Sequence, residues 1–394
     1  ITVLYTPVAQ KAVVKFVEVD PTNTDKVITP GLADPIAVTG KSEAAYPATT
    51  ATSVTNKIAE LVKKGYELVN NGFVSTDKFD KDAAVDQEYV VKFKAKVVDI
   101  PSFDPTKPSS NDNPKPTPGV TPIDPNNPDG PKWTEALINA VKVQEEVTRT
   151  ITYVKKETAD GPEIADAKPT VTQTAHFKRS ATYNAVTGTI TYGNWESADK
   201  ELAKVDTPTL TGYVADKASV DKVETNENST GLDQKVVYTK LGSWVPKVPG
   251  VETPTPLPYP NNPTDPTKPG DPTDPNTPNV PVIPYVPGYT PKIGETPLQP
   301  KVPNDPTQGY IPPAVPTEPG KDTPIEYVAD PQKAVVKVFN TTTGTEVEIP
   351  AEKVSIDNGT TDSAIPTDSV TAKIADLEKR GYIVENKDLL KDQK

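Results

Sequence analysis

The sequence predicts an α+β and mostly β protein, made of small modules strung on proline-rich extended linkers. Three observations support this prediction: clustered prolines, an internal repeat, and segments in which apolar and polar residues alternate. Of the 46 prolines, ten lie in 101–131 and twenty-five in 246–324. The remaining segments, 1–100, 132–245 and 325–394, are each of about domain size. We therefore expect three modules, joined by a linker at 101–131 and a stalk at 246–324.

The predicted stalk contains a regular proline pattern, with a proline at every third position from Pro260 to Pro287. Proline fixes φ near −65° and lacks a backbone donor, which excludes a helix or a central strand. Because polyproline II has about three residues per turn, this spacing predicts a stiff, solvated rod. A disordered low-complexity linker has similar chemistry and remains an open alternative.

Part of the first module recurs at the C-terminal end of the sequence. QKAVVKF (10–16) returns as QKAVVKV (332–338), and KIAELVKKGYELVN (57–70) returns as KIADLEKRGYIVEN (373–386). The second copy is six residues shorter between these motifs, and we expect the deletion in a surface loop. It reaches Lys394 without a counterpart of Glu88–Val98. We expect the sequence to be a piece of a larger protein that ends within a repeat.

The first module, 1–100, reads as strands around one helix. A β-branched run predicts a strand at 12–19, and the short run 66–69 predicts another. The helix between them carries one apolar face and ends at Gly65, with a cap at Thr52 or Ser53. The face consists of Val54, Ile58, Leu61 and Val62. A closing strand at 89–97 alternates, with Tyr89, Val91, Phe93, Ala95 and Val97 inward. These elements predict a small sheet with a helix across one face.

The middle module, 132–245, reads as mostly β. Alternation or β-branched composition predicts strands at 147–154, 171–184, 188–195 and 234–241, and a short helix at 134–141. The second and third of these strands are joined by a turn from Asn184 to Gly188.

Several motifs of the middle module resemble a known family. They are TRTITYV (148–154), QTAHFKR (173–179), TGTITYGNW (187–195), TPTLTGY (207–213) and KVVYTK (235–240). These motifs are similar to the second-type module of the mucin-binding (Mub) repeats of lactobacillus surface adhesins. The 1–98 unit and its copy look like the first-type module, and PVIPYVPGYTPK (281–292) resembles the connector between repeats. The family has no site motif that transfers residue by residue.

The resemblance implies ubiquitin-like β-grasp modules in an extended array. It also implies an extracellular protein attached to the bacterial cell wall through a part that lies outside this sequence. The implied partners are mucin glycoproteins or their glycans, bound multivalently, and some relatives bind immunoglobulins. A purely structural stalk, which projects a binding domain located elsewhere in the parent protein, is the alternative function.

Charge and residue inventory exclude several other classes of function. The net charge is −12 and each of the five segments is net negative, so nucleic acid is not an expected partner, and no apolar run is long enough to insert into a membrane. No cysteine is present and His176 is the only histidine, which excludes thiol chemistry and a two-histidine metal site. No phosphate-binding or nucleophile motif appears. We expect neither an enzyme nor a cofactor.

Two further chemical possibilities stay open at this stage. Asp20, Asn23 and Asp25 offer oxygen ligands for Ca²⁺, but their spacing fits no EF-hand, and a solvated turn is the favoured reading. An intramolecular Lys–Asn crosslink of the kind found in bacterial surface proteins is the other, although no particular pair is marked in the sequence.

The candidate glycan-binding residues are Tyr192, Asn194, Trp195 and Tyr183, with Trp244 near the end of the same module. Aromatic rings with neighbouring amides offer the platform and the hydrogen bonds that sugars require. Strand alternation places Tyr192 and Asn194 on one face and Trp195 on the other. The competing interpretation is that Trp195 and Tyr213 belong to the core of a small β domain.

Overall fold

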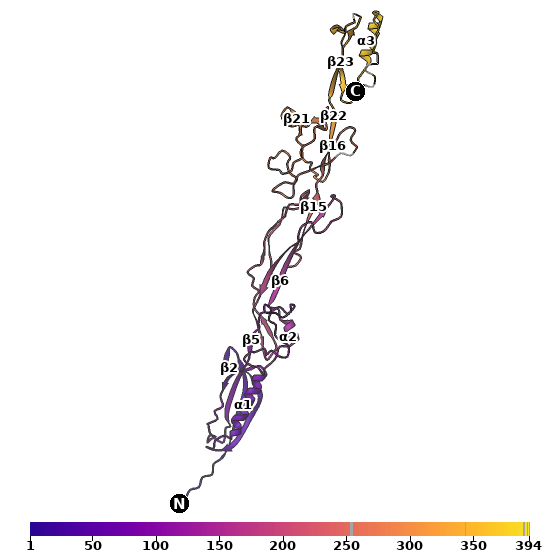
Figure 1. The fold of residues 1–394 in the computed structure, drawn as a ribbon. Coiled ribbons are helices and arrows are strands. Elements are labelled where there is room, and N and C mark those ends of the chain that lie inside the picture. Colours follow the sequence, from indigo (N-terminus) through magenta and orange to yellow (C-terminus); the bar gives the residue numbers. More distant parts are fainter. Residues whose placement is uncertain (253–254, 343, 389–390, 392, 394) are drawn as a thin grey trace. The chain divides into compact units, whose positions relative to one another are not determined.

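The computed structural model describes residues 1–252, 255–342, 344–388, 391 and 393; the remaining residues of the predicted 246–324 and 325–394 segments lie outside this description. Strands dominate the fold and helices are few, as the sequence predicted (Figure 1). The chain divides into two compact units. Unit 1 is Ile1–Thr148, Gln173–Leu202 and Val223–Gly231, and unit 2 is Arg149–Thr172, Ala203–Lys222 and Leu232–Lys394. No helix in the described ranges has the length and hydropathy needed to cross a membrane.

The first module of unit 1 is a four-stranded sheet with one helix packed against it. Its elements are β1 (Ala9–Asp20), β2 (Asn23–Lys41), α1 (Ala48–Lys63), β3 (Tyr66–Asn71) and β4 (Gln87–Ala95). The strand order is β2-β1-β4-β3, in which β1 and β4 run parallel and the other pairs are antiparallel. The predicted alternation of β4 is confirmed, because Tyr89, Val91 and Phe93 are buried in one core with Val54 and Leu61 of α1.

Of three boundaries predicted for this module, the end of the helix is confirmed, whereas the start of the helix and the end of β4 are wrong. The helix begins directly after Pro47 rather than at Thr52 or Ser53, since proline tolerates the position before a helix, where no backbone donor is needed. It ends as predicted, with Gly65 at a φ of +98°. Because β4 ends at Ala95, Val97 is 50% exposed and not buried as predicted.

The long strand β2 was not predicted. Its sequence contains Pro30, Gly31 and Pro35, which are turn signals in a linear reading. β2 lies at the edge of the sheet and its pairing with β1 is interrupted by several register shifts. Edge strands and bulges accommodate proline because a backbone position that faces away from the neighbouring strand does not have to donate a hydrogen bond.

Residues 97–143 and 181–192 of unit 1 build a second core. Its elements are β5 (Val97–Asp99), α2 (Glu135–Ala140), β8 (Ala181–Asn184) and β9 (Ile190–Tyr192), with the antiparallel strand order β5-β8-β9. The α2 helix matches the predicted short helix. Thr134 caps it, since the Thr134 side chain accepts a hydrogen bond from the backbone N–H of Leu137.

The prediction of a plain linker at 101–131 is therefore wrong. Phe103 and Ile123 are buried and share a core with Trp133. The buried Asn113 holds the intervening loop, because its side-chain amide donates to the carbonyl of Pro108 and its Oδ1 accepts from the N–H of Asp104. Buried apolar residues and side-chain hydrogen bonds thus hold this proline-rich segment in a folded conformation.

The remaining strands of the middle module are mostly short. They are β6 (Gln144–Lys156), β7 (Val171–Lys178), β10 (Glu201–Leu202), β11 (Val205–Asp206), β12 (Tyr213–Ala215), β13 (Ser219–Val220), β14 (Val223–Glu224) and β15 (Gln234–Lys240). In unit 2, β15 pairs in parallel with β6 and antiparallel with β12. Val147, Arg149, Ile151 and Tyr153, which share one face of the strand predicted at 147–154, are all buried. The strands predicted at 171–184 and 188–195 are shorter or divided.

The predicted stalk at 246–324 is a folded module and not an extended rod. The strands in this part of unit 2 are β16 (Ser243–Lys247), β17 (Leu257–Pro258), β18 (Tyr289–Ile293), β19 (Thr296–Pro297), β20 (Pro300–Val302), β21 (Asp305–Tyr310) and β22 (Thr323–Ala329). Five of them form a sheet in the order β17-β16-β22-β18-β19. Trp244, Tyr259, Ile283, Ile325 and Tyr327 are buried in its core.

Several of the regularly spaced prolines of this module lie in turns. In Asp265-Pro266-Thr267 the Asp265 carboxylate accepts a hydrogen bond from the backbone N–H of Thr267 at 3.0 Å. Asp271-Pro272-Thr273 and Asp274-Pro275-Asn276 repeat this bond. The Asp or Asn side chain closes the turn while the proline sets φ of the central residue. At Pro266, Pro272 and Pro275 the regular spacing therefore coincides with tight turns.

The last module of unit 2 is the partial second copy of the first module. Its elements are β23 (Pro331–Val336), β24 (Phe339–Asn340), β25 (Val347–Glu348), the 3₁₀ helix η1 (Pro350–Glu352), β26 (Val354–Thr360) and α3 (Asp368–Lys379). β23 pairs with β26, as β1 pairs with β2. Val370 of α3 packs against Val354 and Ile356, as the predicted helix face requires.

Candidate functional site

The four predicted glycan-binding residues lie on and beside the β8–β9 hairpin of unit 1. Tyr183 on β8 pairs with Ile190 on β9, and Tyr192 is the last residue of β9. The predicted turn is confirmed, since the backbone N–H of Gly188 donates to the carbonyl of Asn184 at 2.9 Å. Asn194 and Trp195 follow after the strand has ended.

Tyr183 and Tyr192 are anchored by the second core of unit 1. Both are half-buried and pack against the cluster around Phe103 and Trp133. The Tyr192 hydroxyl donates to the carbonyl of Ala140 at 3.0 Å and accepts from the backbone N–H of Lys142 at 3.3 Å. The chain just after α2 therefore fixes the position of the Tyr192 ring.

Arg179 stacks against two of the predicted residues. Its guanidinium carbon lies 3.8 Å from the centroid of the Tyr192 ring and 4.3 Å from the centroid of the Trp195 ring. A guanidinium at this distance from an aromatic face is attracted by the negative charge density of the ring. Tyr192, Arg179 and Trp195 form one cluster, which we call the Arg179 stack.

The Arg179 stack corrects the prediction that Tyr192 and Trp195 point to opposite faces. Alternation holds only within a strand, and β9 ends at Tyr192. Gly193 and Asn194 then lie in irregular chain, which brings Trp195 to the same guanidinium. Asn194 itself is exposed beside the stack. Gly193 was the available signal, because glycine in a strand pattern often marks its interruption.

The charge of Arg179 is not neutralised within the described residues. Its Nε donates to the carbonyl of Lys142 at 2.7 Å, and its backbone N–H donates to the carbonyl of Val143. No ion pair among the described side chains includes its guanidinium. The stack therefore presents a fixed, half-buried cation between two aromatic rings, which suits a carboxylate or sulfate oxygen.

His176 lies on β7, three residues before Arg179, and is exposed next to the buried Phe177. Its Nδ1 lies 2.7 Å from the Asp199 carboxylate, and its backbone N–H also donates to Asp199, at 2.9 Å. The ring hydrogen bond is the main reason that the pKa of Asp199 falls to about 2. The sequence did not predict a role for Asp199 or Arg179. Each of them is recognised by contacts with side chains elsewhere in the sequence, and no local pattern indicates those contacts.

The other residues considered for function occupy structural positions. Trp244 is fully buried in unit 2 and belongs to the core of the 243–329 module. Asp20 and Asn23 accept hydrogen bonds from the backbone N–H groups of Thr22 and Asp25, which is the solvated turn that the sequence favoured. Within the described ranges, no group of three or more possible metal-ligating side chains occurs.

Two domain families match this chain. Residues 10–95 match the family described as mucin binding domain, and residues 138–242 match the family described as Muc B2-like domain. Both are adhesion or binding families rather than enzyme families. The resemblance to mucin-binding repeats that the sequence motifs indicated is confirmed. No curated protein sequence matches the chain.

Several solved structures are similar to the chain. The crystal structure of Mub-RV has 22% sequence identity and a TM-score of 0.39, and the match covers 59% of this chain and 98% of that chain. A type 2 repeat of the mucus binding protein from Lactobacillus reuteri has 24% identity and a TM-score of 0.32, with coverage of 59% and 99%. A MucBP domain from Pediococcus pentosaceus has 26% identity and a TM-score of 0.20, with coverage of 24% and 97%.

Proposed function

We propose that this chain, which carries a mucin binding domain at 10–95 and a Muc B2-like domain at 138–242, is a repeat unit of a bacterial surface adhesin. Its partners are mucin glycoproteins, recognised through their glycans. The matches to two domain families in the order predicted from the motifs are the observation that carries this proposal. The protein acts outside the cell, attached to the cell wall through another part of the parent protein.

The Arg179 stack is the binding site that we propose for these glycans. Sugar rings pack their C–H groups against aromatic faces, and Trp195 is half-buried rather than enclosed in a core. The un-neutralised guanidinium of Arg179 offers bidentate hydrogen bonds to a carboxylate or sulfate group. Acidic mucin glycans carry such groups. A net negative chain gains no attraction from its overall charge, so a fixed local cation has to supply the affinity.

Each module binds weakly in this proposal, and repetition supplies avidity. Linked weak sites raise the effective concentration of the next site without any new contact. The first module fits a ubiquitin-like β-grasp, with the strand order β2-β1-β4-β3 and α1 against the sheet. We keep the boundaries near 100, 132, 245 and 325 as proposals, with 101–131 and 246–324 as folded connectors.

The test measures binding of the full chain to immobilised mucin, before and after enzymatic removal of sialic acid and sulfate. We expect Arg179→Gln to weaken binding by about tenfold, since a charged hydrogen bond contributes about 1.5–3 kcal/mol. Lys178→Gln is the matched control, because Lys178 is the exposed cation beside Arg179 and lies outside the stack. Equal binding by the Arg179→Gln and Lys178→Gln variants contradicts the proposed site.

The alternative function, a structural stalk that projects a binding domain located elsewhere, makes a different prediction for the same experiment. A stalk leaves the full chain without measurable affinity for mucin at any repeat number. Binding to immunoglobulin is a separate property that we propose only by family analogy, and a parallel surface coated with immunoglobulin tests it.

A further inference from the structure

The first and last strands of the first module lie side by side and run parallel. Residues 12–18 of β1 pair in register with residues 87–93 of β4. Because the chain enters this module at the start of β1 and leaves it at the end of β4, a pull along the chain draws the two strands in opposite directions. The hydrogen bonds between them are then strained together. Strands that are peeled apart from one end lose these bonds one after another instead.

Two further modules have the same arrangement. In the sheet β12-β15-β6-β7, the first strand in sequence is β6 and the last is β15, and residues 151–156 pair in parallel with 234–239. In the 243–329 module, residues 244–247 of β16 pair in parallel with 323–326 of β22. The three sheets differ in sequence and in strand order, so they share this relationship between the first and last strands and little else.

Side chains of the paired strands interlock in the core of each module. Val14 and Phe16 of β1 lie opposite Tyr89 and Val91 of β4, and all four are buried in one cluster. Since protein interiors are close-packed, one strand cannot slide along the other without pulling such side chains out of the core. Buried residues occupy both strands in the other two modules as well: Ile151, Tyr153, Val236 and Tyr238 in the middle module, and Trp244 and Ile325 in the 243–329 module.

The last strand of each module continues almost directly into the next strand. Lys96 alone separates β4 from β5, Leu241 and Gly242 separate β15 from β16, and Asp330 alone separates β22 from β23. Each of these four residues donates its backbone N–H to a backbone carbonyl, at 2.8 to 3.0 Å. Force along the chain therefore passes from one strand to the next without first drawing out a loop.

The regularly spaced prolines lie outside this path. Residues 259–288 connect β17 to β18, and both strands lie in sequence between β16 and β22. Because β16 and β22 pair directly, force passes between them and bypasses the proline-rich segment. The turns at these prolines are thus protected from stretching as long as β16 and β22 stay paired.

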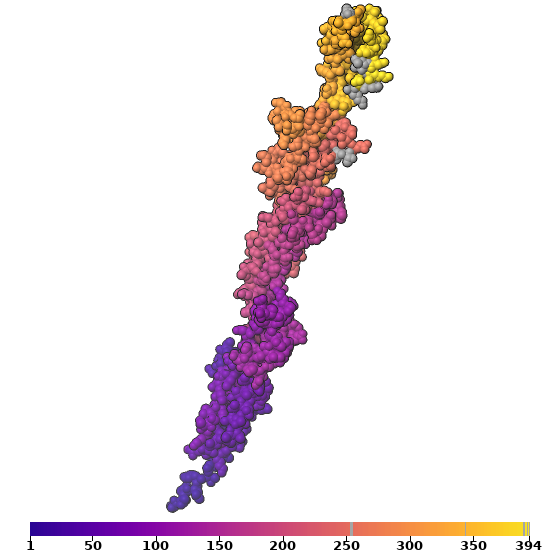
Figure 2. Space-filling view, in the orientation of Figure 1, coloured from indigo at the N-terminus to yellow at the C-terminus, as the bar shows by residue number. Residues whose placement is uncertain are grey.

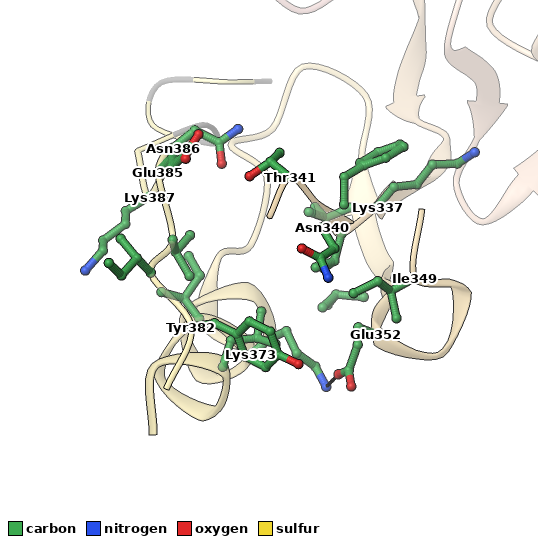
Figure 3. A pocket seen from close by; sticks show the side chains of 18 of the residues that line it. Lys337, Asn340, Thr341, Ile349, Glu352, Lys373, Tyr382, Glu385, Asn386 and Lys387 are labelled. Carbon is green, nitrogen blue, oxygen red and sulfur yellow. Dashed lines mark hydrogen bonds and ion pairs between the residues drawn. The ribbon is translucent and has the colours of Figure 1, made fainter. Parts of the chain in front are cut away.

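The described part of the last module has a different geometry. The start of β23 pairs with the end of β26, at Pro331 and Thr360, so the two strands are antiparallel. A pull on these two ends peels the strands apart. Residues of β24 and α3 line a cavity of about 750 Å³ in this module (Figure 3). Within this chain, the described part of the last module provides the comparison for the other three.

We propose that the first module, the middle module and the 243–329 module bear mechanical tension, each through its parallel first and last strands, which we call the strand clamp. The strand clamp keeps a module folded while force acts along the chain. The source of the force rests on the proposed function, because an adhesin that is fixed to a cell and bound to mucin is stretched by moving fluid. Forced unfolding depends on the unfolding rate and not on equilibrium stability, so the direction of the force decides the resistance.

The test is single-molecule force spectroscopy of the full chain, pulled between two introduced cysteines. The natural sequence contains no cysteine, so each pair alone defines the points of attachment. Lys11→Cys with Val97→Cys shears the strand clamp of the first module, whereas Lys11→Cys with Asp86→Cys peels the same strands apart from one end. All three positions are exposed, and circular dichroism checks the fold. At equal loading rate, we expect the shearing pair to unfold at a force at least about twofold higher.

The other two modules extend the test. In the middle module, Thr152→Cys with Lys240→Cys shears the strand clamp, and Thr152→Cys with Lys235→Cys peels it, with the same expected difference. In the 243–329 module, Lys240→Cys with Val328→Cys applies shear. This strand clamp is the shortest of the three and includes Pro246 and Pro324, which lack backbone donors, so its shear force should be the lowest.

Three outcomes overturn the proposal. The first is an equal force for shearing and peeling in the first and middle modules. The second is a shear force for the 243–329 module above both others, which would show that strand pairing does not set the force. The third is unfolding of the first or middle module before the last module when the chain is pulled through tags at its two ends. None of these measurements involves mucin, so a failure of mucin binding contradicts the proposed function alone.

Discussion

Tyr5 and Tyr327 lie at equivalent distances before the repeated QKAVVK motif, yet Tyr5 is 90% exposed and Tyr327 is 5% exposed. The offset that relates Gln10 to Gln332 also relates Tyr5 to Tyr327. Tyr327 lies on β22, which has β16 and β18 as neighbours. Residues 1–8 belong to no strand in the described chain, and their end stands clear of the rest of unit 1 (Figure 2). The burial of Tyr327 therefore accompanies two partner strands, which residues 1–8 do not have among the described residues.

The first prediction concerns this pair of tyrosines. Tyr327→Ala should lower the free energy of unfolding of unit 2 by about 3–5 kcal/mol, since it removes a buried ring from a packed core. The variant also lacks the hydrogen bond that the Tyr327 hydroxyl donates to the carbonyl of Pro284. Tyr5→Ala is the matched control and should change stability by less than about 0.5 kcal/mol. Denaturant unfolding followed by circular dichroism measures both, and equal effects would show that the 243–329 module does not depend on this core.

The sequence predicted the structure correctly where a periodic apolar pattern coincides with burial of the apolar residues. Alternation along 89–97 located the inward Tyr89, Val91 and Phe93, and the glycine after the apolar helix face located the end of α1. Such patterns are local, because a half-buried strand or helix imposes its own period on the residues that it contains.

Other features depended on contacts that no linear pattern contains. The regular prolines from Pro260 to Pro287 predict a rod because proline excludes regular structure. Asp side chains instead close turns at several of these prolines, and Tyr259 and Ile283 supply a core. Trp195 joins Arg179 and Tyr192 because the chain leaves the strand after Tyr192.

The second prediction separates a platform role from a core role for Trp195. Trp195→Ala should leave unit 1 folded and reduce its stability by about 0.5–1 kcal/mol, the usual contribution of a partly exposed cation–π contact. Trp133→Ala, at a residue that is 2% exposed, should instead cost about 3–5 kcal/mol. Circular dichroism during denaturant unfolding compares the two variants. A loss for Trp195→Ala as large as that for Trp133→Ala would place Trp195 in the core.

The third prediction uses two glycines with similar backbone geometry. Gly65 and Gly381 end α1 and α3 with φ of +98° and +91°. Alanine at Gly381 meets open space, so its cost should be about 1–2 kcal/mol of backbone strain alone. At Gly65 the added Cβ would lie 2.6 Å from the carbonyl oxygen of Ala185, which adds about 1–3 kcal/mol of overpacking. In thermal unfolding, Gly65→Ala should lower the melting temperature more than Gly381→Ala does. The reverse ranking would show that the backbone at Ala185 moves to accommodate the added Cβ.

The last prediction concerns the acid stability of unit 1 and follows from Asp199. Hydrogen bonds from the His176 side chain and backbone lower the pKa of Asp199 from 3.8 to about 2. A carboxyl with a depressed pKa in the folded state stabilises the fold above its unfolded pKa, and this contribution is lost as the pH falls through the folded pKa. Between about pH 5 and pH 2, the wild type should therefore lose more of its free energy of unfolding than Asp199→Asn. His176→Gln keeps the backbone donor and should lie between the two. Parallel curves for the wild type and Asp199→Asn would show that this hydrogen-bonded pair does not contribute to the stability of the folded state.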